Sequence, residues 1–106
     1  MNLSQRGLSH LVFFELKDKS DAARDALVTA CHKYLSDHPG TLHFSAGTRA
    51  EQYTRPVNDQ EFDVALMLVF ASVADHDRYQ EAPRHKQFIS EQSPNWASVR
   101  VFDALA

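Results

Sequence analysis

Hydrophobic and polar residues follow different periods along the chain, and these periods predict four strands. Residues 10–16 (HLVFFEL) form a short run rich in Val, Phe and Leu, which is typical of a strand. Residues 42–47 alternate apolar and polar side chains, the period of a half-buried strand. Residues 62–70 (FDVALMLVF) are almost wholly apolar, as in a central strand that is covered on both faces. Residues 96–103 (WASVRVFD) make the last predicted strand.

Two helices are predicted between these strands. Ser20 can cap the first helix, which then carries apolar residues at helical spacing: Ala23, Leu27, Ala30, Cys31 and Tyr34. Ser72 and Asp75 resemble a capping box at the start of the second helix. Pro83 should break or kink that helix, because proline cannot donate a backbone hydrogen bond. Residues 48–61 are polar and lack a period, so we expect them to form the longest and most mobile loop.

The resulting order, β-α-β-β-α-β, is the α+β ferredoxin-like pattern, with a four-stranded antiparallel sheet and helices on one face. The other face of this sheet would then carry the apolar residues of opposite parity: Leu11, Phe13, Ala65, Met67, Val69, Trp96 and Phe102. Contiguous exposed apolar patches usually indicate an interface. We therefore expect a homodimer in which two sheets pack face to face and close a barrel.

The composition limits what the chain can be. Its 106 residues fit a single domain, residues 1–106, and its net charge is −3 with acids and bases interspersed. No basic stripe is present, so nucleic acid is not an expected partner. The single cysteine, Cys31, excludes an internal disulfide and a multi-cysteine metal site, and it fits a reducing cytoplasm. The sequence shows neither a signal peptide nor an apolar run long enough to cross a membrane, so we expect a soluble cytoplasmic protein without membrane contact.

No cofactor or metal motif is recognisable. The chain has only three glycines, and none of them builds a phosphate-binding loop. His76 and Asp77 with His43 lack a metal-ligand spacing, and we expect four histidines at the surface, namely His32, His38, His43 and His76. The sequence therefore predicts neither a cofactor nor a bound metal ion.

Several of these pieces, taken in order, resemble the stress-responsive A/B-barrel family, also called dimeric α/β-barrel proteins. The matching pieces are HLVFFELK at residues 10–17, Gly40 and Gly47, FDVALMLVFAS at 62–72, Tyr79, Pro83-Arg84-His85, Phe88, Trp96 and VFD at 101–103. No piece is specific alone, but their order covers most of the chain. The resemblance implies the βαββαβ fold and a dimeric barrel.

The resemblance also implies candidate site residues. One family member with a known reaction is a plant cyclase that makes olivetolic acid from a linear tetraketide by aldol condensation. Its site combines a histidine base on the second helix segment, an aspartate late in the last strand, a tyrosine and a first-strand histidine. The corresponding residues here are His85, Asp103, Tyr79 and His10. Where the family often reads His-Pro-Ala-His, this chain has Ala82-Pro83-Arg84-His85, so one histidine is missing and a bulky cation is added.

Strand adjacency supports part of this constellation without the family. In the ferredoxin-like strand order 4-1-3-2, the last strand runs antiparallel beside the first, so Asp103 should lie near His10 on the helix-facing side. A kink at Pro83 would let His85 meet Asp103 in a cleft between helices and sheet. An aspartate that accepts from one imidazole nitrogen makes the other nitrogen a better base. Tyr79 could donate a hydrogen bond to a carbonyl oxygen of a substrate.

Two functional interpretations fit these residues. The first is a cofactor-independent acid–base enzyme that acts on a small carbonyl-bearing or aromatic molecule, with polyketide cyclase-like or related lyase or isomerase chemistry. His85 would be the base and Asp103 would orient it, while Tyr79 and His10 would polarise the carbonyl. The second is a non-catalytic, stress-associated or ligand-binding homodimer in which the same residues hold the barrel together. A cofactor-free monooxygenase, which uses the same dimeric barrel, is a third alternative.

Overall fold

The structure, a computed structural model, describes residues 2–106 apart from the side chain of Ser4. The strands are β1 (Leu8–Leu16), β2 (Thr41–Thr48), β3 (Val64–Phe70) and β4 (Trp96–Leu105), and the helices are α1 (Asp21–Leu35), α2 (Val73–Glu81) and α3 (Pro83–Gln92). Short 3-10 turns at Leu3–Gln5 and Ser93–Asn95 precede β1 and β4. The predicted order of strands and helices is confirmed. Over residues 2–106, no helix has the length and apolar character needed to cross a membrane.

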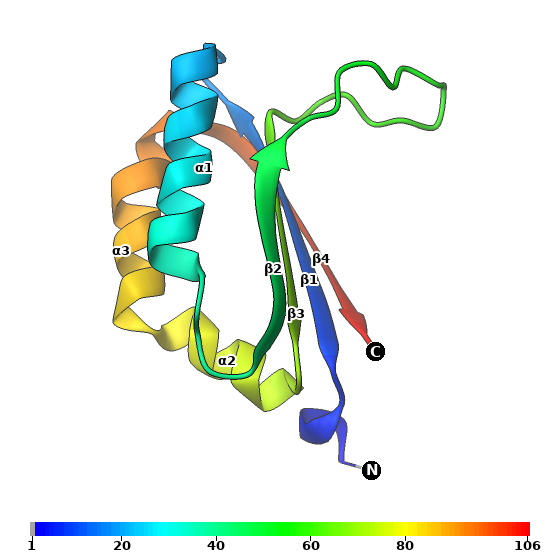
Figure 1. Ribbon diagram of the computed structural model, residues 1–106, viewed down its shortest axis with the longest axis vertical. Coiled ribbons are helices and arrows are strands. Elements are labelled where there is room, and N and C mark those ends of the chain that lie inside the picture. Colours follow the sequence, from blue (N-terminus) through cyan, green and yellow to red (C-terminus); the bar gives the residue numbers. More distant parts are fainter. Residues whose placement is uncertain (1) are drawn as a thin grey trace.

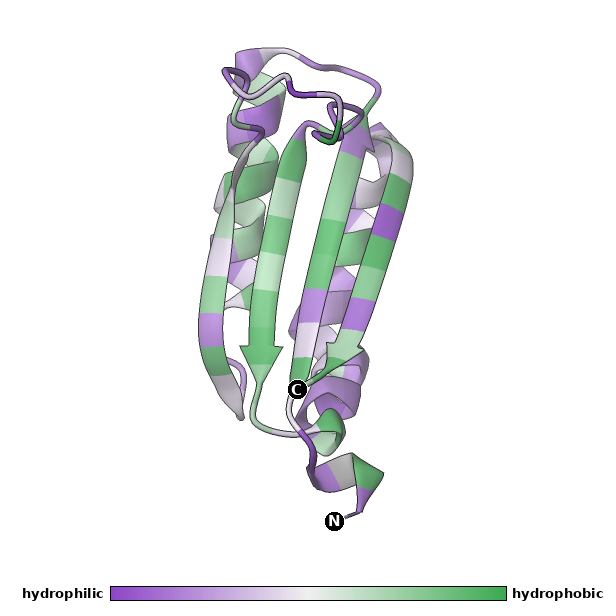
Figure 2. Ribbon diagram, turned by 90° about the vertical axis from the view of Figure 1, so that its right-hand side faces the viewer, coloured by the Kyte–Doolittle hydropathy of each residue, from purple (hydrophilic) through white to green (hydrophobic). Residues whose placement is uncertain are grey.

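The four strands form one antiparallel sheet in the order β2-β3-β1-β4, which is the predicted ferredoxin-like order. Helices α1 and α3 lie side by side against one face of this sheet, and α2 lies near one end of the pair (Figure 1). The opposite face, turned toward the viewer in Figure 2, is bare of helices over residues 2–106. Its two central strands, β1 and β3, are largely hydrophobic.

The hydrophobic core lies between the helices and the sheet. Side chains along β1 alternate strictly between buried and half-buried, so every second residue from Leu8 to Leu16 enters the core. The core is completed by buried residues of β3 and the helices, which are Val64, Leu66, Leu68, Phe70, Leu27, Ala30, Cys31, Tyr34, Leu35, Tyr79 and Phe88. Burial raises the pKa of the Cys31 thiol to about 12, so Cys31 is a packing residue and not a nucleophile.

The bare side of the sheet, called here the open face, carries Leu11, Phe13, Ala65, Met67, Val69 and Phe102, as the parity of the strands predicts. The ring centroids of Phe13 and Phe102 are 5.8 Å apart, and the ring centroid of Phe62 lies 5.0 Å from that of Phe13. The prediction for Trp96 is wrong. A β-bulge shifts the β1–β4 register beside Leu16, so Trp96 turns into the core and packs 4.9 Å from Phe14.

The helix boundaries follow local chemistry. The hydroxyl of Ser20 accepts a hydrogen bond from the Ala23 N–H and caps α1. At the start of α2, the Ser72 hydroxyl accepts from the Asp75 N–H, as the capping-box pattern predicts. The second bond differs from that pattern, because the Ser72 hydroxyl, and not its backbone N–H, donates to the Asp75 carboxylate. Pro83 stands at the first position of α3, so it ends α2 and starts a new helix in a new direction.

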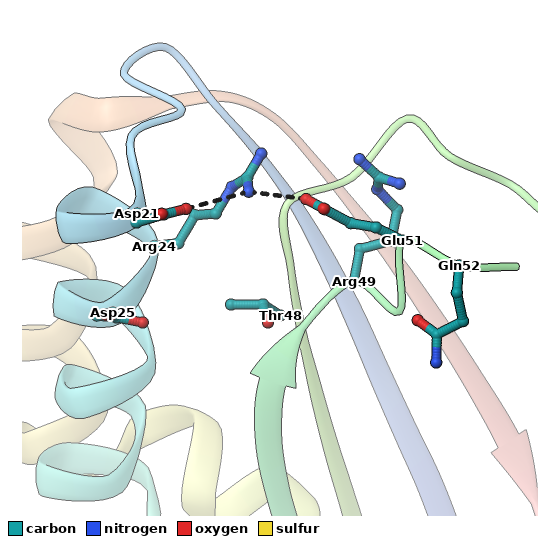
Figure 3. A pocket seen from close by; sticks show the side chains of 7 residues that line it. All are labelled: Asp21, Arg24, Asp25, Thr48, Arg49, Glu51 and Gln52. Atoms are coloured by element: carbon teal, nitrogen blue, oxygen red, sulfur yellow. Dashed lines mark hydrogen bonds and ion pairs between the residues drawn. The ribbon is translucent and has the colours of Figure 1, made fainter.

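The long β2–β3 connection is fixed at its ends by charged groups. Asp63, which is buried directly before β3, lies 3.2 Å from the Arg24 guanidinium on α1. The same guanidinium lies 3.1 Å from Glu51 in the loop and 3.7 Å from Asp21 (Figure 3). The polar hollow drawn there is lined by charged groups that largely neutralise one another. We therefore interpret these ion pairs as contacts that hold the loop against α1.

Candidate functional site

A groove of about 480 Å³ lies between the helix-facing side of β1 and β4 and the helices α2 and α3. Its polar lining residues are His10, His76, Gln80, His85 and Asp103. Its apolar walls are formed by Val12, Phe14, Leu66, Phe88, Ile89, Trp96, Val99 and Val101. Within the β1–β4 register, the pair His10–Asp103 lies toward one end and the pair Leu16–Trp96 at the other, so the polar lining residues of these two strands gather at one end of the groove. Such a groove can hold a small organic molecule with a polar group at that end.

The polar end is organised by a hydrogen bond between His10 and Asp103. These residues are direct register partners on β1 and β4, and His10 Nδ1 lies 2.5 Å from Asp103 Oδ1. Because an ionised carboxylate can only accept, Nδ1–H of His10 donates and its Nε2 carries the lone pair. Burial lowers the pKa of His10 below its ordinary value, although the Asp103 carboxylate acts in the opposite direction. At neutral pH His10 is therefore a neutral imidazole with an unprotonated Nε2.

His85 lines the same groove from the first turn of α3. Its Nδ1 is buried and has no hydrogen-bond partner within residues 2–106. Burial, followed by the charges of neighbouring histidines, lowers the pKa of His85 to about 4, so this ring is neutral at pH 7. The predicted pairing of His85 with Asp103 is not what the structure shows. Asp103 accepts from His10 instead, because the strand register places these two residues directly opposite each other.

Tyr79 lies behind the groove and is not among its lining residues. Its ring packs edge-on against His85 at 4.7 Å and against His38 at 5.0 Å. Its hydroxyl is buried without a hydrogen-bond partner within residues 2–106, and burial raises its pKa above the ordinary value. In this arrangement the Tyr79 ring packs against His85 from the core side. The sequence suggested that the Tyr79 hydroxyl would donate to a substrate, but Tyr79 is not among the residues that line the groove.

Two histidines that were expected at the surface are not there. His38 is buried, and its Nε2–H donates to the Tyr34 carbonyl oxygen over 2.7 Å. His76 is half-buried and lines the groove, with its ring 4.9 Å from the ring of His10. The spacing of three residues between His76 and Tyr79 contains the missed signal, since it places both on one face of α2.

Arg84, the bulky cation noted in the Ala82-Pro83-Arg84-His85 segment, is not among the residues that line the groove. Arg84 is exposed and donates to the carbonyl oxygens of Lys33 and Ser36, each over 3.0 Å. These carbonyls belong to the end of α1, where a cation is favourably placed. Arg84 therefore holds α3 against α1 and leaves the groove unobstructed.

The family assignment follows from comparison of the whole sequence. The sequence pattern of the stress responsive A/B barrel domain (Dabb) family matches residues 8–105. The chain belongs to this family. A comparison with curated proteins gave no significant match.

Solved structures share the fold of this stress-responsive A/B barrel domain. A Dabb family protein with a ferredoxin-like fold from Mesorhizobium loti has a TM-score of 0.79 and 24% identity, over 96% of this chain and 98% of that one. A hydroxynitrile lyase from Passiflora edulis has a TM-score of 0.76 and 22% identity, over 96% and 94% of the two chains. A dimeric ferredoxin-like protein of unknown function from Thermobifida fusca has a TM-score of 0.79 and 16% identity, over 100% and 96%. At these identities the likeness shows the fold alone.

Proposed function

We propose that this domain binds a small carbonyl-bearing molecule in the groove and performs cofactor-independent acid–base chemistry on it. His10 is the base, and Asp103 is the residue that orients it. The observation that carries the proposal is the 2.5 Å hydrogen bond between these two side chains at the polar end of a groove with apolar walls. The proposal keeps Asp103 as the orienting residue, as expected from the sequence, but replaces the expected base His85 with His10.

The local geometry supports this division of roles. Asp103 accepts from Nδ1 and so leaves Nε2 of His10 as the nitrogen that can take a proton. Asp103 also stabilises the imidazolium that forms when His10 accepts this proton. His85, whose pKa is lowered to about 4, is a neutral ring at pH 7 and can donate or accept a hydrogen bond to the substrate.

The groove indicates the class of substrate. Its volume of about 480 Å³ lies within the range of ordinary ligand pockets. Phe88 and Trp96 offer ring faces for an aromatic or short alkyl group. The hydroxynitrile lyase of Passiflora edulis, by its name, cleaves a hydroxynitrile; in such a cleavage the hydroxyl proton is removed, the C–O bond becomes a carbonyl, and the bond to the nitrile carbon breaks to release cyanide. Chemistry of this kind requires a base beside an apolar pocket, and the groove provides both.

Proton exchange can test the proposal before the natural substrate is known. Aryl methyl ketones and 1,3-diketones are incubated with the protein in D₂O, and loss of the α-proton signal is followed by NMR above the buffer rate. His10→Ala should lower the exchange rate by about 10²–10⁴-fold, the usual contribution of a general base. Asp103→Asn, which keeps the shape but disfavours the reactive tautomer, should also lower it strongly. His32→Ala, a change of an exposed histidine on α1, is the matched control and should have no effect. Equal rates for His10→Ala and His32→Ala would contradict the proposal.

One observation favours binding without turnover as the second candidate function. Two buried ring nitrogens of groove residues, His85 Nδ1 and Trp96 Nε1, have no hydrogen-bond partner within residues 2–106. Buried polar groups usually find a partner, and a ligand with a polar atom could satisfy them. A non-catalytic ligand-binding domain would bind a carbonyl compound in the groove but leave its α-protons exchanging at the buffer rate.

We further infer that two copies of the chain pair through the open face. Leu11, Phe13, Met67 and Phe102 form an apolar surface on which no helix packs within residues 2–106. The similar protein from Thermobifida fusca is described as dimeric, which agrees with this use of the fold. Pairing two open faces would close the predicted barrel.

A further inference from the structure

We propose that a divalent transition-metal ion, Zn²⁺ by preference, binds to His10, His76 and Asp103, and that the bound ion switches off the base at His10. The binding stands on geometry alone, whereas the loss of the base rests on the proposed function.

The three side chains already present their ligand atoms to one another. One potential ligand atom from each lies within 4.8 Å of the other two. In a tetrahedral zinc site with bonds of 2.0–2.1 Å, neighbouring ligand atoms are about 3.3 Å apart. The cluster therefore needs only small side-chain movements to close around an ion. Two imidazoles and one carboxylate form a donor set that suits Zn²⁺.

The surroundings of His76 are those of a prepared metal ligand. Its Nδ1–H donates to the Asp77 carboxylate over 3.2 Å, and its Nε2 accepts from the Gln80 amide over 3.3 Å. Metal-binding histidines commonly donate their second ring N–H to a carboxylate, which fixes the ring and makes the ligand nitrogen more basic. Among the described residues, the Gln80 amide is the one hydrogen-bond partner of His76 Nε2, and at 3.3 Å this bond is long and weak. A metal ion can therefore displace Gln80 at small cost.

The ion would have an open coordination position. His10, His76 and Asp103 all line the groove, so the groove supplies the entry path and a place for a water molecule or ligand atom. Three protein ligands with one open position form the arrangement seen in exchangeable and catalytic zinc sites, whereas structural sites are closed by four protein ligands.

Binding has a defined chemical consequence for His10. We assign Nδ1 as the His10 ligand atom, because this ring atom lies 2.5 Å from the Asp103 carboxylate that binds the same ion. The metal then takes the place of the Nδ1 proton, and that proton moves to Nε2 of the same ring. Nε2–H can no longer accept a proton from a substrate, and Asp103 no longer orients the ring. The ion and the base function therefore exclude each other.

Cobalt absorption tests the site directly. Tag-free protein is titrated with Co²⁺, whose d–d bands intensify when it enters a four- or five-coordinate site, and Zn²⁺ is then added as competitor. We expect one ion per chain and full displacement by Zn²⁺. His76→Ala should abolish the bands, and Asp77→Asn should weaken affinity about 10–100-fold, the usual cost of losing an outer carboxylate. His32→Ala, the exposed control, should bind as the wild type does. Circular dichroism confirms that each variant is folded.

Three results would overturn the metal site: no saturable bands, bands that persist in His76→Ala, or bands lost in His32→Ala. The second part is tested in the proton-exchange assay, where one equivalent of Zn²⁺ should stop exchange and EDTA should restore it. Exchange that continues in the zinc-loaded protein would overturn the loss of the base. If no carbonyl compound exchanges at all, the proposed function and the inhibition both fail, and the cobalt titration alone decides the metal site.

Discussion

Replacement of Asp63 by asparagine should destabilise the fold substantially, although Asp63 is not among the residues that line the groove. Asp63 is only 4% exposed, and its Oδ2 accepts from the Leu16 N–H over 2.8 Å and from Lys19 Nζ over 3.0 Å. Its Oδ1 lies 3.2 Å from the Arg24 guanidinium. These contacts tie the end of β1, the start of α1 and the start of β3 together.

The magnitude can be worked from these contacts. Asparagine can still accept from the Leu16 N–H, but it loses the charge and turns an amide group toward two cations. A hydrogen bond to a charged group contributes about 1.5–3 kcal/mol, and the bond to Lys19, whose side chain is 52% exposed, falls at the low end. We expect a loss of about 2 kcal/mol at pH 7. With a urea m-value of about 2 kcal/mol/M, the unfolding midpoint should fall by roughly 1 M.

The pH dependence gives the sharper test. Burial acts to raise the pKa of Asp63, but the hydrogen bonds from Leu16 and Lys19 and the charges of Lys19 and Arg24 together outweigh it and lower the pKa. A carboxyl group whose folded-state pKa is depressed contributes stability above its unfolded pKa of about 4, and this is lost as the pH falls through the folded pKa. The difference between wild type and Asp63→Asn should therefore be full at pH 7 and shrink below about pH 4.

Urea unfolding at a fixed chain concentration measures this difference, with fluorescence of Trp96, the single tryptophan, as the signal. Asp59→Asn is the matched control, because Asp59 pairs with Arg100 at 2.5 Å but is exposed to solvent. The Arg100 hydrogen bond lowers the pKa of Asp59 to about 2, yet solvent screens the pair, so this change should barely move the midpoint. Equal midpoints for Asp63→Asn and the wild type, or a loss that persists unchanged at pH 3, would refute the reasoning.

Four further predictions follow from the same structure. Phe13→Asp should block pairing of the open faces, because it would bury an unpaired charge; light scattering should give the mass of one chain for the variant and of two for the wild type, and a dimeric variant would exclude this interface. Amides of residues 48–61 should exchange rapidly with solvent, except near the bonded loop ends, and slow exchange throughout would contradict a mobile loop. Tyr79→Phe removes a hydroxyl that has no partner, so urea unfolding should show equal or greater stability, and the exchange activity should persist; loss of activity alone would restore a catalytic role for Tyr79. NMR titration should place the pKa of His85 near 4, and a midpoint at 6 or above would contradict its burial.

The fold could be predicted from the sequence because each element carries its own local signal. The strict alternation of β1, the caps at Ser20 and Ser72, and the break at Pro83 are all short-range properties. The alternation of side chains along the strands gave a wrong face only for Trp96, where the β1–β4 register changes. The bulge next to Leu16 adds one residue to β4, which turns Trp96 from the open face into the core, and counting along a strand cannot detect such a shift.

The site could be predicted only in part, for a related reason. The adjacency of His10 and Asp103 follows from strand order, which pattern reasoning supplies. His85 lies on α3, a new helix that begins at Pro83, and the direction of its ring depends on how α3 packs. The sequence therefore could not show that His85 does not pair with Asp103. The spacing of His76 and Tyr79 indicates that both lie on one face of α2, but the contact of His76 with His10 depends on how α2 packs against the sheet, which the spacing does not give.

The groove and the open face lie on opposite sides of the same sheet. A dimer that pairs its open faces would therefore point its two grooves outward, away from each other and from the shared barrel. Each groove would be filled without any contact with the other, so a binding isotherm should show two equal sites per dimer and no cooperativity. A ligand could then occupy either protomer without loosening the assembly, which would let the pair of chains remain joined throughout a catalytic cycle.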